Sequence, residues 1–309
     1  MNVDVFTLFP EWFEWFPSQR HVANALSAGH SIGYVSYREH TPLKAGQVDD
    51  TPFGGGAGMV LRVDVVDAAL EAVYGPDRSG RRIVALTPGG RRLDDALVTE
   101  LAGEESLTLL CGRYEGFDER VVERLCTDAV SVGPFVLAGG ELAAMTVMDA
   151  VLRKLPGSLG HADSAVEESF SQALAGLPEY PHYTRPASYR GWGVPEVLLS
   201  GHHGNVAAWR LEEARRRATQ PVLDRLASLE ATVRAGRAID AFLAPFAVWP
   251  DGPPGRLPPG EISLEVHGQT AVARVIGPEG VAATDTWVLH GGEWMLAARA
   301  LAANRGTDA

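Results

Sequence analysis

Residues 107–155 hold the feature that most constrains the fold: an apolar run, a glycine-rich loop and a helical pattern, in that order, twice. The first unit reads LTLLC and GRYEG before a helical pattern over 118–126, and the second reads AVSV and GPFVLAGGE before one over 141–155. Loops at the carboxyl ends of parallel strands hold ligands in such folds, and glycine lets backbone atoms approach a small molecule closely. Either loop alone is equally typical of an ordinary turn, but the pair predicts a cofactor site.

Strand and helix patterns alternate through the first 160 residues. Strand patterns cover residues 3–9, 31–37 and 82–86, and helical patterns cover 11–16, 64–74 and 93–101. This alternation predicts an α/β domain over residues 1–160 with a mostly parallel sheet.

The remainder of the chain is organised differently. Residues 161–187 are rich in Gly, Ser, Pro and acidic side chains with little periodicity, which predicts a linker, and helical spacing over 188–236 predicts a helical domain. The segment PDGPPGRLPPG at 250–260 then breaks any helix. Alternating residues within 261–299 predict an antiparallel meander of three or four strands, so we expect a β-rich extension over 237–309.

Composition limits the class of protein. The chain is 46% hydrophobic, which is typical of a globular protein, and no run approaches about 18 uncharged apolar residues, so we expect no membrane span. No basic segment precedes an apolar run at the start, which predicts no signal peptide and a cytoplasmic location. The two cysteines are too few for a disulfide framework or a zinc cluster. Of these, Cys111 is expected to be a small buried hydrophobe.

The net charge of −12 argues at first against a nucleic-acid partner, but phosphate binding requires only local positive potential. The segment WRLEEARRR, residues 209–217, offers such a region within a helical pattern. A solvated helix face with i,i+4 ion pairs is one interpretation of it. Contact with nucleic acid is the other, because Arg binds phosphate through two parallel hydrogen bonds and Trp209 could stack on a base.

Two further motifs are rejected as functional sites on their context. Residues 54–58, GGGAG, satisfy a G-x-G-x-G pattern, but no apolar strand precedes them and a strand-like MVL follows, which excludes a Rossmann nucleotide site. His202 and His203 are adjacent, but no Cys or carboxylate lies at ligand spacing from them. A solvated loop is therefore the better interpretation, and no metal site is predicted.

Seven segments together resemble the signatures of bacterial tRNA (guanine-N1)-methyltransferases. They are VDVFTLFPEWF, VDDTPFGGGAGMVLR, LTPGGRRLD, CGRYEGFDERV, VGPFVLAGGELAAM, LGHADSAVEESF and PHYTRP. The resemblance runs from Met1 to about Leu229 and leaves the C-terminal extension uncovered. It implies a SPOUT fold with a deep trefoil knot, S-adenosylmethionine as the methyl donor, and the guanine at position 37 of tRNA, next to the anticodon, as the target. It also implies a homodimer with sites shared between subunits. The family uses Mg²⁺, and the sequence leaves open whether this chain needs it.

The resemblance assigns the methyl donor to three loops. The residues expected to bind it are Leu86, Thr87, Pro88, Gly89, Gly112, Tyr114, Glu115, Val132, Gly133, Leu137, Gly139 and Gly140. Glu115 would face the positively charged end of the donor, and an exposed turn carboxylate is the other interpretation of that residue. The loop at residues 54–58 would lie beside the donor and the target guanine, with Ala57 where the family usually has Pro and Phe53 where it usually has Tyr.

Methylation of guanine N1 requires removal of its proton, because the protonated nitrogen is not nucleophilic. A positioned base contributes roughly 10²–10⁴ in rate. The family's base is an Asp, and the matching residue here is Glu168, one methylene longer, in a loop that can absorb the difference. Negative charge builds on O6 as the proton leaves, and Arg153 matches the Arg that stabilises it. On its own, an Arg near a helix C-terminus is also an ordinary partner of the helix dipole.

The same resemblance assigns contacts to tRNA and to the target guanine. The expected residues are Asp50, Gly58, His182, Tyr183, Arg185, Trp209, Arg210 and Arg215. The competing hypothesis is a non-catalytic RNA-binding protein that keeps the knotted fold, supported by Glu168, Ala57 and Ala143 in place of the usual family residues. Retention of Arg153, of Glu115 and of the glycine loops favours the enzyme.

The last hairpin, DTWVLHGGEWMLAARAL, is similar to the closing strands of nuclear-transport-factor-2-like (SnoaL-like) domains, and the extension is shorter than a whole such domain. Its apolar strand faces need cover, because a small isolated meander is marginal in water. We therefore expect the extension to pack against its own subunit or against its dimer mate.

Overall fold

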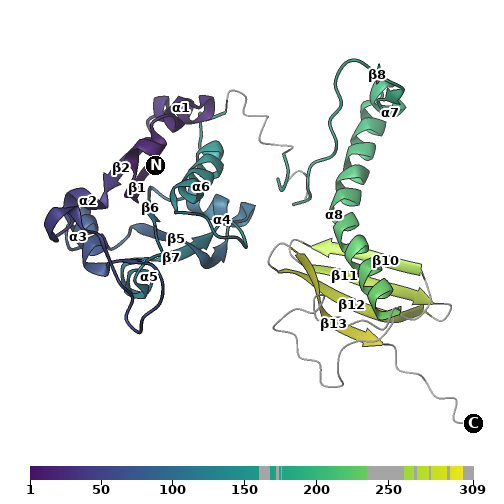
Figure 1. Cartoon of the computed structure of the whole chain (residues 1–309). Helices are drawn as coiled ribbons and strands as arrows, with labels where there is room; N and C mark the ends of the chain where they lie inside the picture. The colour runs from purple at the N-terminus through teal and green to yellow at the C-terminus, as the bar shows by residue number, and fades with distance from the viewer. Residues whose placement is uncertain are drawn as a thin grey trace, which may run out of the picture. The chain divides into compact units, whose positions relative to one another are not determined.

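The computed structural model describes residues 1–159, 168–171, 174, 176–234, 261–267, 270–277, 280–290 and 293–301. The chain divides into two compact units, Met1–Ala165 and Val166–Ala309, which can be followed by colour in Figure 1. Within the described ranges, no helix combines the length and the apolar character that crossing a bilayer would require.

The first unit is built on a five-stranded sheet in the order β2-β1-β6-β5-β7. Its strands are β1 (Asn2–Thr7), β2 (Ser31–Ser36), β5 (Arg82–Arg92), β6 (Ser106–Cys111) and β7 (Asp128–Ser131). Every pair of neighbours in this sheet is parallel. The predicted α/β class is therefore confirmed.

Helices and short strands connect these five strands. They are η1 (Pro10–Phe13), η2 (Phe16–Ser18), α1 (Arg20–Ser27), α2 (Tyr37–His40), η3 (Lys44–Gly46), β3 (Asp49–Asp50), β4 (Val60–Leu61), α3 (Val63–Tyr74), α4 (Asp95–Ala102), α5 (Glu119–Leu125) and α6 (Glu141–Lys154). The helix predicted over residues 11–16 is instead two 3₁₀ turns. Pro10 and Pro17 explain this difference, because each proline is tolerated in a first turn but stops an α-helix from running through it.

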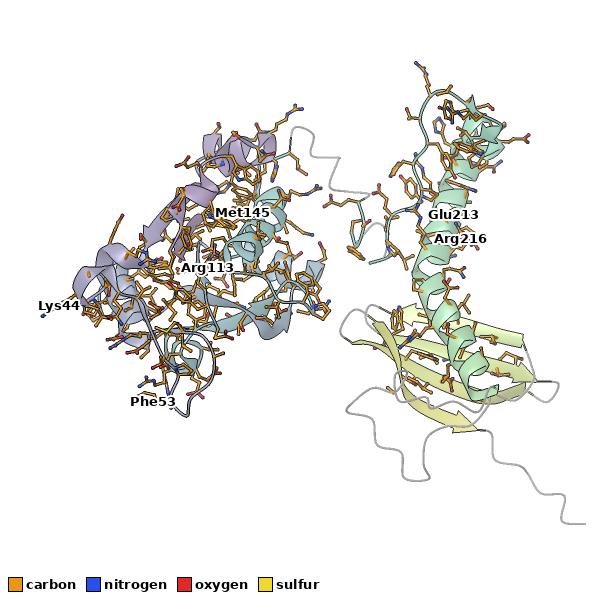
Figure 2. All side chains as sticks on the ribbon, viewed as in Figure 1. Lys44, Phe53, Arg113, Met145, Glu213 and Arg216 are labelled. Atoms are coloured by element: carbon orange, nitrogen blue, oxygen red, sulfur yellow. The ribbon has the colours of Figure 1, made fainter. Side chains whose placement is uncertain are left out.

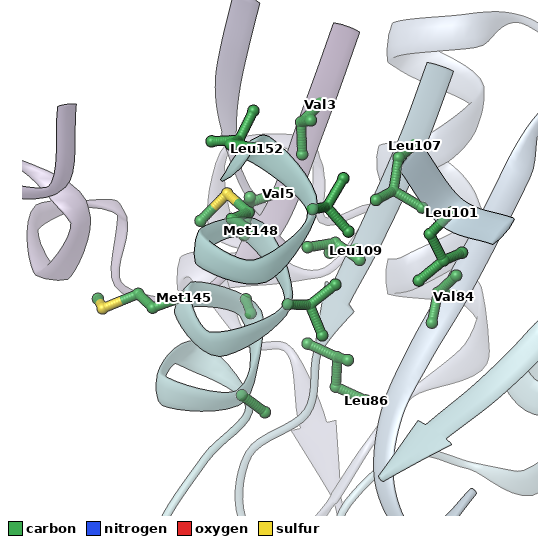
Figure 3. Packing of buried hydrophobic residues seen from close by; sticks show 14 of the residues in the cluster. Val3, Val5, Val84, Leu86, Leu101, Leu107, Leu109, Met145, Met148 and Leu152 are labelled. Atoms are coloured by element: carbon green, nitrogen blue, oxygen red, sulfur yellow. The ribbon is translucent and has the colours of Figure 1, made fainter. Parts of the chain in front are cut away.

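Apolar side chains cover both faces of the parallel sheet. On β6, Leu109 belongs to one buried cluster and Leu110, its neighbour, to the other. Figure 3 shows the first cluster, in which Met148 and Leu152 of α6 pack over the strands. Burial on both faces explains why the β6 sequence reads as an unbroken apolar run rather than an alternating one.

The second unit combines a long helix with an antiparallel sheet. Its elements are β8 (Ser188–Tyr189), β9 (Trp192–Gly193), α7 (Glu196–Leu199), α8 (His203–Arg234), β10 (Glu261–His267), β11 (Thr270–Gly277), β12 (Gly280–His290) and β13 (Glu293–Leu301). The last four strands pair in sequence order, which confirms the predicted meander. The helix α8 contains Pro221 and lies across this sheet (Figure 1).

One core joins the sheet to the helix. Val222, Leu226 and Leu229 from α8 pack with Trp287 and Leu296 from the sheet, and all five are buried. The Arg225 Nε also donates to the main-chain oxygen of Trp294 at 3.1 Å. The C-terminal extension thus packs against its own chain, as expected.

Candidate functional site

A pocket of about 300 Å³ opens between three loops, which follow Leu86 within β5, Cys111 at the end of β6 and Ser131 at the end of β7. It is lined by eleven of the twelve residues that the resemblance assigns to the methyl donor, namely Leu86, Thr87, Pro88, Gly112, Tyr114, Glu115, Val132, Gly133, Leu137, Gly139 and Gly140. The twelfth, Gly89, is exposed and does not line it. The volume lies at the lower end of the roughly 300–1,000 Å³ that is typical of small-molecule sites.

Glycine allows two of the pocket loops to touch through their backbones. The amide of Gly140 donates to the carbonyl oxygen of Gly112 at 2.8 Å. A Cβ atom on Gly140 would come 2.6 Å from the Cα of Cys111, a distance that real Cβ atoms do not show. Gly140 therefore cannot be replaced without separating the loops that form the pocket.

A third wall comes from an excursion of the chain within β5. Val130 of β7 pairs both with Leu86 and with Arg91, so residues 87–90 project from the strand between these two pairings. Gly90 closes the excursion where a Cβ atom would collide with the backbone of Val130. The sequence predicted a strand that ends at 86 and missed its continuation, because a proline and two glycines are typical of a terminal turn.

A buried ion pair at the pocket wall, to which Arg113 contributes, was not predicted. Arg113 Nε lies 3.0 Å from Glu141 Oε2, and the hydroxyl of Thr7 donates to Glu141 Oε1 at 2.8 Å. The Glu141 side chain is fully buried and that of Arg113 is 14% exposed. The guanidinium also lies over the rings of Phe9 and Trp12, 4.4 and 4.8 Å from their centroids. Figure 2 labels Arg113 inside the first unit.

This ion pair links three segments far apart in sequence: the end of β1, the loop after β6 and the start of α6. The signal in the sequence is an Arg and a Glu that each directly follow a glycine in the two loops. Such spacing alone does not predict a contact, because only the fold brings the loops together. A buried pair of this kind is costly to break, since loss of one partner leaves an unpaired buried charge.

The surroundings of Cys111 and of Cys126 make both thiols unreactive. Burial raises the pKa of the Cys111 thiol well above its usual range, and the nearby Glu141 carboxylate raises it further. Burial likewise raises the pKa of Cys126 to about 12. Both thiols are therefore protonated at neutral pH, and the interpretation of Cys111 as a packing residue is confirmed.

The glycine-rich loop at 54–58 lies beside Glu115. The amide of Glu115 donates to the Met59 carbonyl at 3.0 Å, and a Cβ atom on Gly58 would come 2.6 Å from Cγ of Glu115. Asp50, at the other end of this loop, forms an ion pair with Arg62 at 3.2 Å. Of the residues predicted to contact guanine, Asp50 and Gly58 are thus placed in the same unit as the pocket.

The two predicted catalytic residues belong to different units. Arg153 is exposed near the end of α6 in the first unit, and Glu168 is half-buried in the second. That Arg153 and Glu168 act together on one substrate stays a prediction. Arg153 lies on the outer side of α6, whose neighbouring residues Val151 and Leu152 face the core.

Most of the predicted tRNA contacts gather along the first half of α8. The ring of Tyr183 lies 6.3 Å from that of Trp209, and the guanidinium of Arg210 lies 4.7 Å above the ring of Tyr180. His182 pairs with Glu179 at 2.7 Å. Arg185 and Arg215 are exposed.

Both interpretations of the arginine segment find support in this geometry. Arg216 pairs with Glu213 at 2.8 Å, which is typical of a solvated helix face, and Arg217 Nη1 donates to the carbonyl of Glu179 at 2.9 Å. The aromatic residues alongside are typical of a nucleic-acid surface. No cluster of three or more His, Cys, Asp or Glu able to hold a metal occurs in the part of the chain that the structure describes.

Comparison with known proteins identifies similar sequences. The family model described as tRNA (Guanine-1)-methyltransferase TrmD matches residues 1–227. A tRNA (guanine-N(1)-)-methyltransferase of Brevibacillus brevis is 49% identical over 219 residues, which is 70% of this chain and 88% of the relative. The enzyme of that name from Rhodospirillum rubrum is 53% identical over 207 residues, covering 67% and 84%. That from Dehalococcoides mccartyi is 44% identical over 246 residues, covering 79% and 98%. The family match ends within α8, before the antiparallel sheet begins.

Proposed function

The chain belongs to the tRNA (guanine-1)-methyltransferase family and methylates N1 of guanine in tRNA, and we propose that its target is guanine 37. We propose further that the methyl donor binds in the pocket between the loops that follow Leu86, Cys111 and Ser131. The observation that carries this proposal is the convergence of eleven assigned residues on one pocket. Family membership also decides between the two functions considered, in favour of the enzyme and against a non-catalytic RNA-binding protein.

The donor implied by a methyltransferase family is S-adenosylmethionine, and the pocket fits it. The loops around Gly133, Gly139 and Gly140 offer backbone groups at the pocket wall, and an added Cβ atom at each of these glycines would collide with neighbouring atoms. Such a surface suits the close approach of adenine and ribose. Glu115 supplies a carboxylate for the cationic end of the molecule. When bound, S-adenosylmethionine supplies a methyl group activated by a positively charged sulfur.

The proton on N1 is the main obstacle to this reaction. In our proposal the carboxylate of Glu168 accepts that proton, which leaves the N1 electron pair free. The methyl carbon that N1 takes up would come from S-adenosylmethionine, and the electron pair of the broken carbon–sulfur bond would stay on the sulfur. Arg153 donates hydrogen bonds to O6, where negative charge builds as the proton leaves. The functional form that we propose is a homodimer with sites shared between subunits, and its support is membership of a family for which the resemblance implies that arrangement.

The proposal extends to the trefoil knot, for which the support is the family match together with the five-stranded parallel sheet. It extends also to Mg²⁺, which prefers to keep several waters and to use one or two carboxylates rather than a cage made by the protein alone. Glu115 is such a carboxylate in the pocket wall. A cytoplasmic location follows from the tRNA substrate.

The C-terminal extension enters the proposal as a partial nuclear-transport-factor-2-like domain. Its support is an antiparallel meander with one face covered by a helix. Because the family match ends at residue 227, the extension has no assigned role in methyl transfer.

The proposed function is tested by methyl transfer to unmodified tRNA transcripts with guanine at position 36 and either guanine or adenine at position 37. We expect labelled methyl groups to enter only the transcript with guanine 37, and nuclease digestion to yield 1-methylguanosine. Chelation by EDTA, followed by Mg²⁺ repletion, tests the metal. Equal incorporation into both transcripts would contradict the assigned position.

A further inference from the structure

Residues 49–61 form a hairpin that projects from the first unit. Its stem is the antiparallel pair of β3 and β4, in which Asp49 lies opposite Leu61 and Asp50 opposite Val60. All residues of the tip from 53 to 58 are exposed. The side chain of Phe53 is 101% exposed, more than any other large apolar residue among those described. Figure 2 labels Phe53 on this projecting loop.

The stem of this hairpin is fixed to the wall of the pocket. The Met59 carbonyl accepts a hydrogen bond from the amide of Glu115 at 3.0 Å, and the amide of Leu61 donates to Gly116 at 2.9 Å. Glu115 and Gly116 both line the pocket. Four residues lie between Phe53 and Gly58, so the Cα atom of Phe53 is at most roughly 18 Å from that of Gly58, which adjoins Glu115.

The tip itself stands clear of the rest of the unit. Gly54, Gly55, Gly56 and Gly58 all have positive φ, from 81° to 127°. An added Cβ atom on Gly54 or Gly55 would meet no atom within 4 Å. Glycine therefore shapes a loop that holds an aromatic ring in solvent at the tip of a hairpin whose stem is bonded to the pocket wall. In the free protein this ring contributes nothing to stability through hydrophobic burial.

We propose that Phe53 is a positioning residue on which an unpaired base next to the target guanine stacks. An enzyme that acts on a ring nitrogen must draw the base out of its stack and into the pocket, which leaves the neighbouring base without a stacking partner. Aromatic side chains replace such partners in single-stranded RNA, with little dependence on base identity. This inference rests on the proposed use of the pocket for methyl transfer.

The test compares three substitutions in the full-length protein: F53A, F53L and F53Y. Leucine keeps apolar volume without a π-face, and tyrosine keeps the ring. We expect F53A and F53L to weaken binding of unmodified tRNA, measured as Kd and as KM, by about 10-fold, and F53Y to stay within twofold of the wild type. The Kd for S-adenosylmethionine and the single-turnover rate at saturating tRNA should change by less than threefold.

Two controls separate this role from others. W15L removes another exposed aromatic ring of the first unit, 55% exposed, and should leave the Kd for tRNA unchanged. An anticodon stem-loop RNA with 2-aminopurine on the 5′ or the 3′ side of the target guanine reports stacking directly. We expect the wild type to quench fluorescence in one of the two RNAs and F53L to lose that quenching.

Tight binding of tRNA by F53L, equal to the wild type, would overturn the inference. So would a fall in oligomeric mass for F53A without a change in tRNA affinity, because the ring would then cover a second copy of the chain. A wild-type protein that fails to methylate tRNA would instead contradict the proposed function, and this outcome is distinguishable because it does not depend on residue 53.

Discussion

The pocket of the first unit and the helix–sheet core of the second contain similar apolar residues but differ in what else is buried. Around the pocket, the buried set includes a charged pair, Arg113 and Glu141, and glycines whose replacement would break contacts between loops. The core around Trp287 consists of apolar side chains from α8 and the sheet, and its one buried charged residue among those described is Asp285 within β12. Burying a charged side chain costs free energy unless a well-placed partner and hydrogen bonds compensate for the lost hydration. This difference teaches that the pocket is built from contacts between loops, including one ion pair, and that the helix–sheet core is built from the packing of a helix on a sheet.

The largest effect should come from Glu168→Gln, which removes the proposed base. This residue belongs to the second unit but lies outside its helix–sheet core. Glutamine cannot accept the N1 proton, so we expect the methyl-transfer rate to fall at least 100-fold with little change in cofactor affinity. Single-turnover methyl transfer and calorimetric binding of S-adenosylmethionine measure the two quantities. Glu196→Gln is the control, because Glu196 is an exposed carboxylate at the start of α7 in the same unit. Rates within threefold of the wild type would mean that Glu167, outside the described residues, or another group is the base.

Leu226→Ala should lower the stability of the second unit and leave catalysis in place. Leu226 is 2% exposed in the core that α8 shares with the sheet. Replacement of a buried leucine by alanine costs about 2–5 kcal/mol. Urea unfolding followed by tryptophan fluorescence measures this loss, and methyl transfer per folded molecule should stay within twofold. If the folded variant lost much of its methyl-transfer activity, the helix–sheet core would have a role in catalysis as well as in stability.

Thr7→Val tests whether the buried pair supports the pocket. The valine has a similar shape but cannot donate to Glu141, so an acceptor is left unsatisfied at a cost of about 1–3 kcal/mol. Because Glu141 also holds Arg113, we expect a fewfold loss of affinity for S-adenosylmethionine along with the loss of stability. Thr146→Val is the control, since Thr146 is exposed on α6 and donates only within its own helix. Equal cofactor affinity in both variants would limit the pair to a role in folding.

The sequence predicted the parallel sheet, the meander and the pocket loops because each depends on a local pattern. Residues 107–111 read as a buried strand, and Gly139 and Gly140 mark a loop that closes on its neighbour. The second half of β5 was missed because its pairing depends on β7, about 40 residues away in the chain. The pair of Arg113 and Glu141 was missed for the same reason, since the contact arises only when two loops meet.

At the two 3₁₀ turns after β1, the sequence predicted an α-helix that the structure does not have. Residues 11–16 have helical spacing, but Pro10 and Pro17 restrict the backbone more strongly than spacing does. Helix α8 shows that the same residue is tolerated elsewhere, because Pro221 lies inside a 32-residue helix that the sheet supports from one side. Tertiary packing decides between these outcomes, and a sequence pattern does not contain it.

The smallest effect on turnover should come from truncation after Gly236, which removes the extension and leaves the family match intact. Residues 237–309 contain five Arg and eight Asp or Glu, a net charge of −3, so they should repel tRNA phosphates rather than bind them. We expect turnover and tRNA affinity within a fewfold of the full chain. The truncation uncovers Val222, Leu226 and Leu229 on α8, so solubility or thermal stability should fall. A truncated variant that also carries Leu226→Gln and Leu229→Gln is the control: if exposed apolar surface is the cause, these changes should restore solubility without altering turnover. A loss of tRNA affinity greater than tenfold would instead place the extension in the substrate site, and the two regions would then share one function.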